Sequence, residues 1–114
     1  MATYTPATLI TSKAFGNGAA NIATWRKQNT AGAGTFDIHR TLIVVTPTAA
    51  RTVTIEQGAV AADTTAQKIL DAEPLTANTS FLRNWWITCA NNDYFEGFAN
   101  NTDINGASYG YTYA

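Results

Sequence analysis

Charge is scarce in this chain of 114 residues. Asp, Glu, Lys and Arg make up 13% of it, against about 25% in typical globular domains. The 7 Lys and Arg residues are scattered along the chain and are nearly balanced by 8 Asp and Glu residues, so the net charge is −1. No basic stripe is present that could neutralise a phosphate backbone. We therefore expect no nucleic-acid partner.

Cysteine and long hydrophobic runs are also scarce. Cys89 is the single cysteine, so no disulfide can form within the chain, and packing or assembly must hold the fold. The longest apolar run, residues 42–45, is far too short to span a bilayer. The first six residues lack the basic and apolar regions of a signal peptide. We expect a soluble protein without a membrane partner, made in a reducing compartment.

The side-chain sets that enzymes use are missing as well. His39 has no second histidine with which to bind a metal, and no serine or cysteine nucleophile motif is present. Cys89 has no basic neighbour in the sequence, which favours a small buried hydrophobe over a reactive thiol. The glycine-rich segments match neither GxGxxG nor a Walker pattern. We expect no catalytic residue, no metal site and no cofactor.

Two pairs of carboxylates lie close together in the sequence, Asp71 with Glu73 and Asp93 with Glu96. A glycosidase needs such a pair across a deep cleft, for which a domain of this size has little room, so we interpret both pairs as surface charge. Asp93, Glu96 and Asp103, with nearby Asn side chains, could form a calcium site. Their spacing matches no known calcium loop, and turns rich in Asn and Asp need no ion to explain them.

What the chain does contain is a series of short strand patterns, rich in Thr and separated by Asn- and Gly-rich turns. No segment has a convincing helical period, and the strands follow one another at intervals of roughly 8–15 residues. The pattern predicts an all-β fold, a single β-sandwich of about eight antiparallel strands in two sheets with jelly-roll winding. We expect a loose arm at residues 1–6 and the sandwich at 7–114. The predicted strands are 7–12, 21–27, 36–46, 51–57, an extended edge at 66–74, two strands within 79–99, and 107–113. Taken alone, residues 66–70 fit a helical turn as well as a strand, and residues 71–74 favour the extended edge.

The stretch 79–99 holds two of the three tryptophans, and we expect the fold to be arranged around it. Side chains alternate between faces along a strand, so Trp85 and Trp86 must emerge on opposite sides. In a two-layer domain only one of these sides meets the core. One indole should therefore fill the core. The other should mark a contact surface, because a ring of ~150–250 Å² is costly to leave in water.

Two hairpins are predicted next to one another in this part of the chain. Asn91, Asn92 and Asp93 indicate a tight turn that joins the two strands of the 79–99 stretch. Polar and apolar residues alternate along the strand 51–57, which should pair with the strand before it. Its side chains are expected to divide between the two faces: Val53 and Ile55 toward the core, and Thr52, Thr54 and Glu56 toward water.

Six aromatic residues remain for a contact surface: Trp86, Tyr94, Phe98, Tyr109, Tyr111 and Tyr113. The three tyrosines alternate along the last strand and therefore share one of its faces. Such a group could be a platform on which sugars stack. It could also be an interface between proteins, where Tyr and Trp are enriched. We favour the interface.

Two segments of the chain have the pattern of a known group of proteins. They are residues 38–58, IHRTLIVVTPTAARTVTIEQG, and residues 75–101, LTANTSFLRNWWITCANNDYFEGFANN, followed by a short Tyr-rich end. Together they resemble small virion proteins of tailed bacteriophages, in which two such strand patterns are followed by a closing C-terminal strand. Asn91, Asn92 and Asp93 stand where that group has a Gly-Asp turn, and the adjacent pair of tryptophans departs from its pattern.

The resemblance implies a non-enzymatic capsid decoration (cement) protein, which binds the outer shell as a homo-oligomer, most often a trimer, and stabilises it. Its partners would be copies of itself and the major capsid protein. Its place would be the capsid surface of the virion, after assembly in the host cytoplasm. We assign self-contact to the six aromatic residues and capsid contact to Thr3, Tyr4 and Pro6 of the arm. A phage tail, fibre or baseplate component and a carbohydrate-binding host-recognition module are the alternatives.

Overall fold

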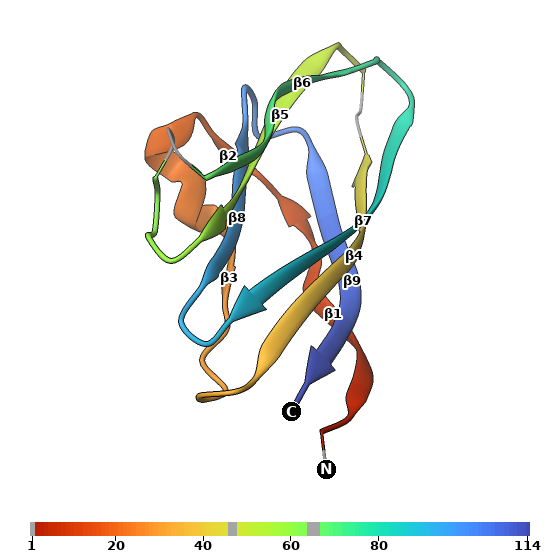
Figure 1. Cartoon of the computed structure of the whole chain (residues 1–114). Helices are drawn as coiled ribbons and strands as arrows, with labels where there is room; N and C mark the ends of the chain where they lie inside the picture. The colour runs from red at the N-terminus through yellow and green to blue at the C-terminus, as the bar shows by residue number, and fades with distance from the viewer. Residues whose placement is uncertain (1, 46–47, 64–66) are drawn as a thin grey trace.

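The computed structural model describes residues 2–45, 48–63 and 67–114, and this part of the chain folds into nine β-strands and one short 3₁₀-helix (Figure 1). No helix in the described ranges is long and apolar enough to cross a membrane. In chain order the elements are β1 (Tyr4–Ala14), β2 (Gly16–Asn17), η1 (Ala19–Thr24), β3 (Trp25–Gln28), β4 (Phe36–Val45), β5 (Arg51–Gly58), β6 (Lys68–Leu75), β7 (Ser80–Ala90), β8 (Tyr94–Ala99) and β9 (Asn105–Tyr113).

The strands form two sheets that pack face to face. The first sheet has the order β1-β9-β4-β7, and the second has the order β2-β8-β5-β6, with β3 also paired to β8. In Figure 1 the strands β2, β3 and β8 of the second sheet lie on the left, and the first sheet lies on the right. The prediction of an all-β sandwich with two sheets is confirmed.

The winding of the chain through these sheets is that of a jelly roll. If the two-residue strand β2 is left aside, the chain crosses from one sheet to the other at every step between successive strands except the step from β5 to β6. The antiparallel pairs are nested, with the first strand beside the last: β1–β9, β3–β8, β4–β7 and β5–β6. Nested pairs closed into a double sheet are the arrangement predicted from the sequence.

The same winding overturns both predicted hairpins. β4 and β5 lie in different sheets, and so do β7 and β8, so neither pair of successive strands is hydrogen-bonded. The tight turn itself is present, because the Asp93 backbone N–H donates to the Ala90 carbonyl over 2.9 Å. Asn92 has φ 74°, a conformation that Asn tolerates better than most residues. The turn is therefore an arch that connects the two sheets. Its residues determine where the chain reverses direction, but they do not determine which strands pair with each other.

Some predicted boundaries also change. β1 begins at Tyr4, which pairs with Tyr113, so the prediction of a loose arm is wrong for Tyr4 to Pro6. Residues 19–24 form η1, and the strand predicted at 21–27 begins only at Trp25. The strand predicted at 36–46 matches β4 up to Val45, and residues 46 and 66 lie outside the described ranges.

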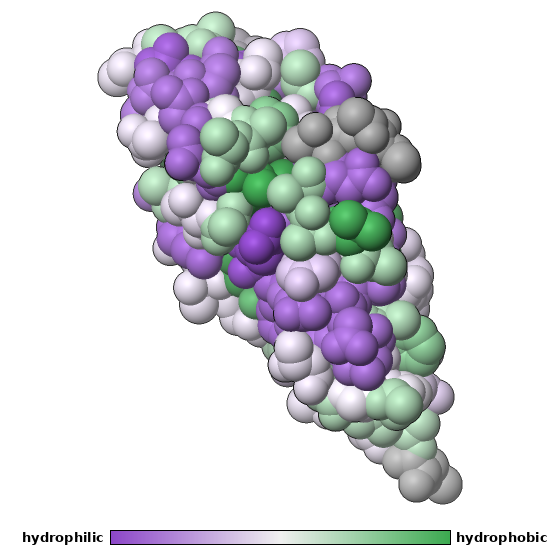
Figure 2. All heavy atoms as spheres, turned by 90° about the vertical axis from the view of Figure 1, so that its left-hand side faces the viewer, coloured by the Kyte–Doolittle hydropathy of each residue, from purple (hydrophilic) through white to green (hydrophobic). Residues whose placement is uncertain are grey.

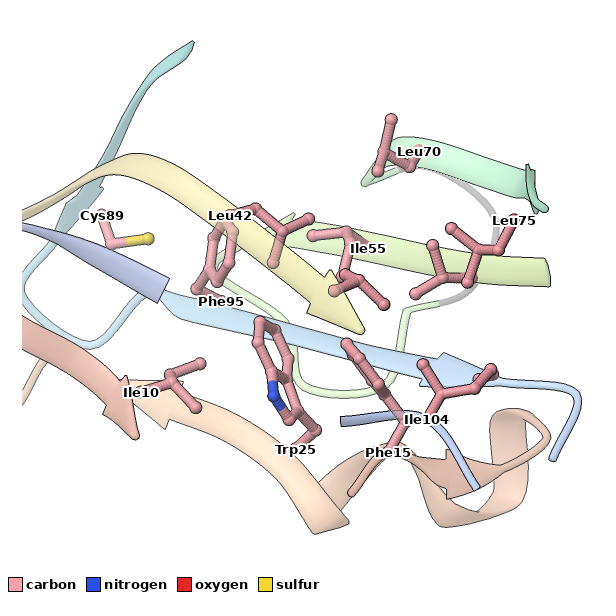
Figure 3. Packing of buried hydrophobic residues seen from close by; sticks show 13 residues of the cluster. Ile10, Phe15, Trp25, Leu42, Ile55, Leu70, Leu75, Cys89, Phe95 and Ile104 are labelled. Carbon is pink, nitrogen blue, oxygen red and sulfur yellow. The ribbon is translucent and has the colours of Figure 1, made fainter. Parts of the chain in front are cut away.

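Aromatic rings form the centre of the core between the sheets (Figure 3). Trp25 is fully buried and stacks on Phe15 with ring centroids 4.6 Å apart, and Phe95 lies 5.9 Å from it. The indole N–H of Trp25 donates to the Gly106 carbonyl over 2.9 Å, so the one polar atom of this ring has a partner. The largest ring of the core thus comes from β3 and not from the 79–99 stretch.

Candidate functional site

The two neighbouring tryptophans of β7 lie on opposite sides of their sheet, as predicted. Trp85 packs against the core, with its ring 6.1 Å from that of Phe95. Trp86 points outward with 51% of its surface exposed, and Leu82 on the same side is 57% exposed. Since only one side of β7 meets the core, the outward side carries apolar surface that the described part of the chain leaves about half exposed.

Aromatic side chains from four strands gather on this outward side of the first sheet. We call this surface the aromatic face; it consists of Tyr4, Phe36, Trp86, Tyr109, Tyr111 and Tyr113. The strand register places Tyr113 between Tyr4 and Phe36, at centroid distances of 4.8 and 5.9 Å. The Tyr4 ring also lies 6.4 Å from Trp86 and 6.3 Å from Tyr111, both edge-on. These contacts join the two edge strands, β1 and β7, across the outside of the sheet.

Two shallow hollows cross the aromatic face. The larger is about 250 Å³ and is lined by Tyr4, Phe36, Ile38, Trp86, Thr88 and Tyr113. The smaller is about 220 Å³ and is lined by Pro6, Arg40, Thr41, Tyr109, Gly110 and Tyr111. Both linings are mainly rings and aliphatic groups with a few hydroxyls and one guanidinium, a composition suited to stacking contacts.

Arg40 supplies the cation of this surface. It lies at an irregularity of β4, where the pairing shifts register between His39 and Thr41. Its guanidinium carbon is 4.7 Å from the centroid of Trp86, within cation–π range, and its Nε donates to the Trp85 carbonyl over 2.8 Å. The bulge and these contacts fix the orientation of Trp86 on the face.

Residues predicted for the capsid contact and residues predicted for the self-contact lie together on the aromatic face. Tyr4 and Pro6, predicted for the capsid, lie on the same face as Trp86 and the three tyrosines. Thr3 lies beside it, exchanging backbone hydrogen bonds of 2.7 and 3.2 Å with Ala114. The assembled face therefore combines part of the predicted self-contact with part of the predicted capsid contact.

Tyr94 and Phe98 do not belong to the aromatic face, so the single self-contact surface predicted from the sequence is divided. Both lie on β8 in the second sheet, where the Arg26 guanidinium carbon is 5.3 Å from the Tyr94 centroid. Figure 2 looks onto the side of the molecule that carries β2, η1 and β8. Hydrophobic residues appear there only as small separate areas among hydrophilic ones.

Phe36, Ile38 and Arg40 were missed in the sequence. They occupy alternate positions of β4, and their strand lies between β9 and β7 in the sheet. The period-two pattern of residues 36–40 was a usable signal for a shared face. The pattern alone does not show that this shared face is the aromatic face. That depends on the pairing of β4 with β9, two segments far apart in the chain.

His39 is buried between the sheets. Its Nδ1 lies 2.6 Å from the Ser108 hydroxyl, and its ring stacks on Phe95 at 3.7 Å. Burial, helped by the charge of Lys27, lowers the pKa of His39 from 6.5 to about 3, so the ring is neutral at pH 7. A neutral ring that is buried and packed on Phe95 is a structural part of the core.

Cys89 is also buried and is reduced. Burial raises the pKa of its thiol to about 12, and the negative charges of Asp37 and Asp93 add to the effect. A thiol in this position stays protonated and unreactive. The prediction of a small buried hydrophobe is confirmed.

Two glutamates that were expected at the surface are buried on the outward side of the second sheet. Glu56 of β5 and Glu96 of β8 are register partners, and neither has exposed surface. Glu96 accepts hydrogen bonds from Arg26 Nε at 2.6 Å and from the Ala62 backbone N–H at 2.7 Å. The chain that follows β5 thus covers this side of the sheet, which is why Glu56 does not face water.

The carboxylate of Glu56 differs from that of its neighbour. Neither of its oxygens has a hydrogen-bond partner in the described part of the chain. Burial, reinforced by the charges of Glu96 and Asp63, raises the pKa of Glu56 from 4.5 to about 7. Thr54, on the same side of β5, is buried as well, and its hydroxyl accepts from the Ala72 N–H over 3.0 Å.

The alternative calcium site is not assembled. Asp93 accepts from the Ala90 N–H over 3.1 Å, Glu96 pairs with Arg26, and Asp103 pairs with Arg51 at 2.8 Å. Within residues 2–45, 48–63 and 67–114, no three His, Cys, Asp or Glu side chains form a group that could hold a metal ion.

Comparison with known proteins finds similarity in structure only: no family model matches the chain, and neither does any curated protein. A chain in the crystal structure of the T13 viral particle of IBDV has a TM-score of 0.54 and 10% sequence identity, covering 98% of this chain and 30% of that chain. A chain in the structure of the infectious bursal disease virus Gx strain has a TM-score of 0.50 and 15% identity, covering 99% of this chain and 32% of that chain. This chain therefore spans about a third of the chains it matches. At such identities the likeness is one of fold: this protein has the same kind of β-sandwich as a part of those two viral chains.

Proposed function

We propose that this protein is a structural component of a virus particle, a decoration protein of a bacteriophage capsid that binds the outer shell and copies of itself. The observation that carries the proposal is the aromatic face, where Tyr4 and Trp86 are 54% and 51% exposed on a rigid sheet. Jelly rolls recur in viral capsids and in lectins. The likeness in fold to chains of infectious bursal disease virus supports a place in a virion.

The aromatic face suits a contact between proteins. Rings of Tyr and Trp give large apolar area at a low cost in side-chain entropy, and they are enriched at the centres of interfaces. The net charge of −1 adds little long-range repulsion between copies. Since Tyr4 and Pro6 share the face with Trp86, one surface cannot hold a shell and a second copy at the same time. We assign the aromatic face to the shell.

The mechanism of stabilisation is linkage. A protein that binds only the assembled lattice adds its binding free energy to that state and to no other. Copies joined to one another bind several lattice sites together and gain from multivalency. The oligomer that the resemblance implies is a trimer, centred on a three-fold position of the lattice.

The experiment is co-sedimentation of the purified protein with empty shells of the virus that encodes it. We expect the wild type to sediment with the shells, and Tyr4→Ala and Trp86→Ala to lose about tenfold or more in affinity, since truncating a buried interface ring costs about 2 kcal/mol or more. Val60→Ala is the control, because Val60 is 57% exposed in the loop after β5. A wild-type protein that stays in the supernatant at saturating concentration contradicts the proposal.

Carbohydrate binding is the second candidate, because the hollow between Tyr4 and Trp86 is lined by rings on which a sugar could stack. A glycan array probed with the wild type and with Trp86→Ala separates the two candidates. Glycan signals that the substitution abolishes, together with no shell binding, would favour a host-recognition module. Shell binding without any glycan signal would favour decoration.

A further inference from the structure

Most cations of this protein are neutralised by a carboxylate of the same chain. Five of the 7 Lys and Arg side chains form an ion pair: Arg26–Glu96, Lys27–Asp37, Arg51–Asp103, Lys68–Asp71 and Arg83–Glu73. The other two, Lys13 and Arg40, have no carboxylate partner in the described part of the chain. Lys13 is exposed on β1, whereas Arg40 is half-buried beside Trp86 of the aromatic face.

The backbone around Arg40 is built to present this side chain. Arg40 is the extra residue of a bulge in β4: the residues on either side of it pair with the consecutive residues Gly110 and Tyr109 of β9, and Arg40 itself has no register partner. β9 approaches β4 closely at this point. A Cβ on Gly110 would collide with the Ile38 carbonyl and would lie 3.1 Å from the backbone nitrogen of Arg40. The glycine therefore permits the bulge that carries the guanidinium.

The guanidinium of Arg40 is held in place but is only partly used. Its Nε donates to the Trp85 carbonyl over 2.8 Å, and its carbon lies 4.7 Å from the centroid of the Trp86 ring. Neither terminal nitrogen has a hydrogen-bond partner within residues 2–45, 48–63 and 67–114. Arg40 lines the smaller hollow of the aromatic face, and Trp86 lines the larger. The unused donors are thus available to a molecule that docks on this face.

Docking on the aromatic face would remove this guanidinium from water together with the rings around it. A charge that is buried without a partner is strongly unfavourable, so the docked surface must supply an acceptor for Arg40. A carboxylate fits best, because its two oxygens match two parallel N–H groups of a guanidinium. We propose that Arg40 binds an Asp or Glu side chain of the capsid subunit, and that apolar groups beside this carboxylate fill the two hollows. The inference rests on the proposed function and specifies the chemistry of the partner at its site.

The size of the hollows favours a carboxylate of a protein over that of an acidic sugar. At about 250 and 220 Å³, both hollows are smaller than the pockets of ~300–1,000 Å³ in which small ligands bind. Side chains of a docked protein need no deeper site, because the rest of the interface also contributes to binding. A bidentate pair has a defined geometry, so it would also set the orientation of this protein on the shell.

The first test is co-sedimentation with empty shells of the virus that encodes the protein, compared for Arg40→Gln and Lys13→Gln. Each substitution removes one unpaired positive charge, but only Arg40 lies beside Trp86. We expect Lys13→Gln to bind like the wild type and Arg40→Gln to bind at least about tenfold more weakly. Arg40→Lys keeps the charge without the planar fork and should fall between them. Equal affinities of Arg40→Gln and Lys13→Gln overturn the inference, and a loss of binding in Trp86→Ala alone would leave the proposed function standing.

The second test separates a lost ion pair from a displaced Trp86 ring. Carboxyl groups of the shells are converted to neutral amides with a carbodiimide and ethanolamine, and shells that stay intact are used. The wild type should then lose at least about as much affinity as Arg40→Gln loses on untreated shells, and the treatment should weaken Arg40→Gln much less than the wild type. If it weakens both proteins by the same factor, no shell carboxylate contacts Arg40 and the inference is wrong.

Two further outcomes concern the proposed function itself. A wild type that binds no untreated shell refutes the proposed function and the inference together. Acidic glycans on the array that bind the wild type but not Arg40→Gln, with no shell binding, would assign Arg40 to a sugar acid and overturn the pairing with a capsid carboxylate.

Discussion

Tyr4, on the first strand, and Tyr113, on the last, face each other across the β1–β9 pair with ring centroids 4.8 Å apart. Just beyond them, Thr3 and Ala114 exchange two backbone hydrogen bonds. Both ends of the described chain are thus held in one sheet, and both contribute to the aromatic face. The first strand therefore links the stability of the fold to the proposed binding surface.

Deleting residues 1–6 should destabilise the protein. The deletion removes three register partners of β9 and at least the two backbone hydrogen bonds between Thr3 and Ala114. At ~0.5–1.5 kcal/mol net for each bond, we expect a loss of at least about 1–3 kcal/mol in the free energy of unfolding. Chemical denaturation measures the loss. The matched variant Tyr4→Ala keeps the backbone and should lose only about 0.2–1 kcal/mol from the ring pair. An unchanged unfolding free energy of the truncated protein would mean that these residues are a loose arm after all.

Much of the fold could be predicted from local pattern. Period-two alternation located β4, β5 and β9 within one or two residues and put Trp85 and Trp86 on opposite sides of β7. The pairing of strands was beyond such a pattern, because a jelly roll places partners as distant as Tyr4 and Tyr113 side by side. A turn such as 91–93 looks the same whether it closes a hairpin or an arch between sheets.

The candidate site was predictable to the same extent. Alternation was enough to put Tyr109, Tyr111 and Tyr113 on one face. Only the spatial neighbours of β9 could show that Tyr4 belongs beside them and that Phe98 does not. The burial of Glu56 could not be predicted for a related reason. A loop can cover the polar side of a strand, and the alternation of polar and apolar residues within that strand gives no sign of the loop.

Glu56 should make the protein less stable as the pH rises toward neutrality. Its pKa is raised from 4.5 in the unfolded chain to about 7 in the fold, so its contribution is fully present below pH 4.5 and is lost as the pH rises to about 7. Glu56→Gln should remove this decline from the curve of unfolding free energy against pH. Glu73→Gln is the control, since Glu73 is partly exposed and paired with Arg83. If Glu56→Gln and the wild type have parallel curves between pH 4.5 and 7, the assignment is wrong.

His39 should have the opposite effect on the pH dependence of stability, making the protein less stable as the pH falls. Its pKa falls from 6.5 in the unfolded chain to about 3 in the fold, so its contribution is fully present above pH 6.5 and is lost as the pH falls to about 3. At ~1.4 kcal/mol per unit the loss could reach about 5 kcal/mol, and between pH 4.5 and 6.5 it partly cancels the effect of Glu56. His39→Gln, which can keep a bond to Ser108 without titrating, should be less stable at pH 7 but should have a flatter acid limb. If the unfolding free energy of this variant falls as steeply with decreasing pH as that of the wild type, the acid destabilisation comes from other groups.

Gly106→Ala should destabilise the core although the glycine has no special backbone conformation. A Cβ at this position would run into the ring of Phe15 and would lie 3.2 Å from the indole nitrogen of Trp25. Because both rings are buried and stacked, neither can move away without opening the packing, and overpacking of this kind costs about 1–3 kcal/mol. The double variant Gly106→Ala, Phe15→Leu frees room for the methyl group. Its loss in unfolding free energy should be smaller than the sum of the two single losses, and strict additivity would show that the clash is relieved elsewhere.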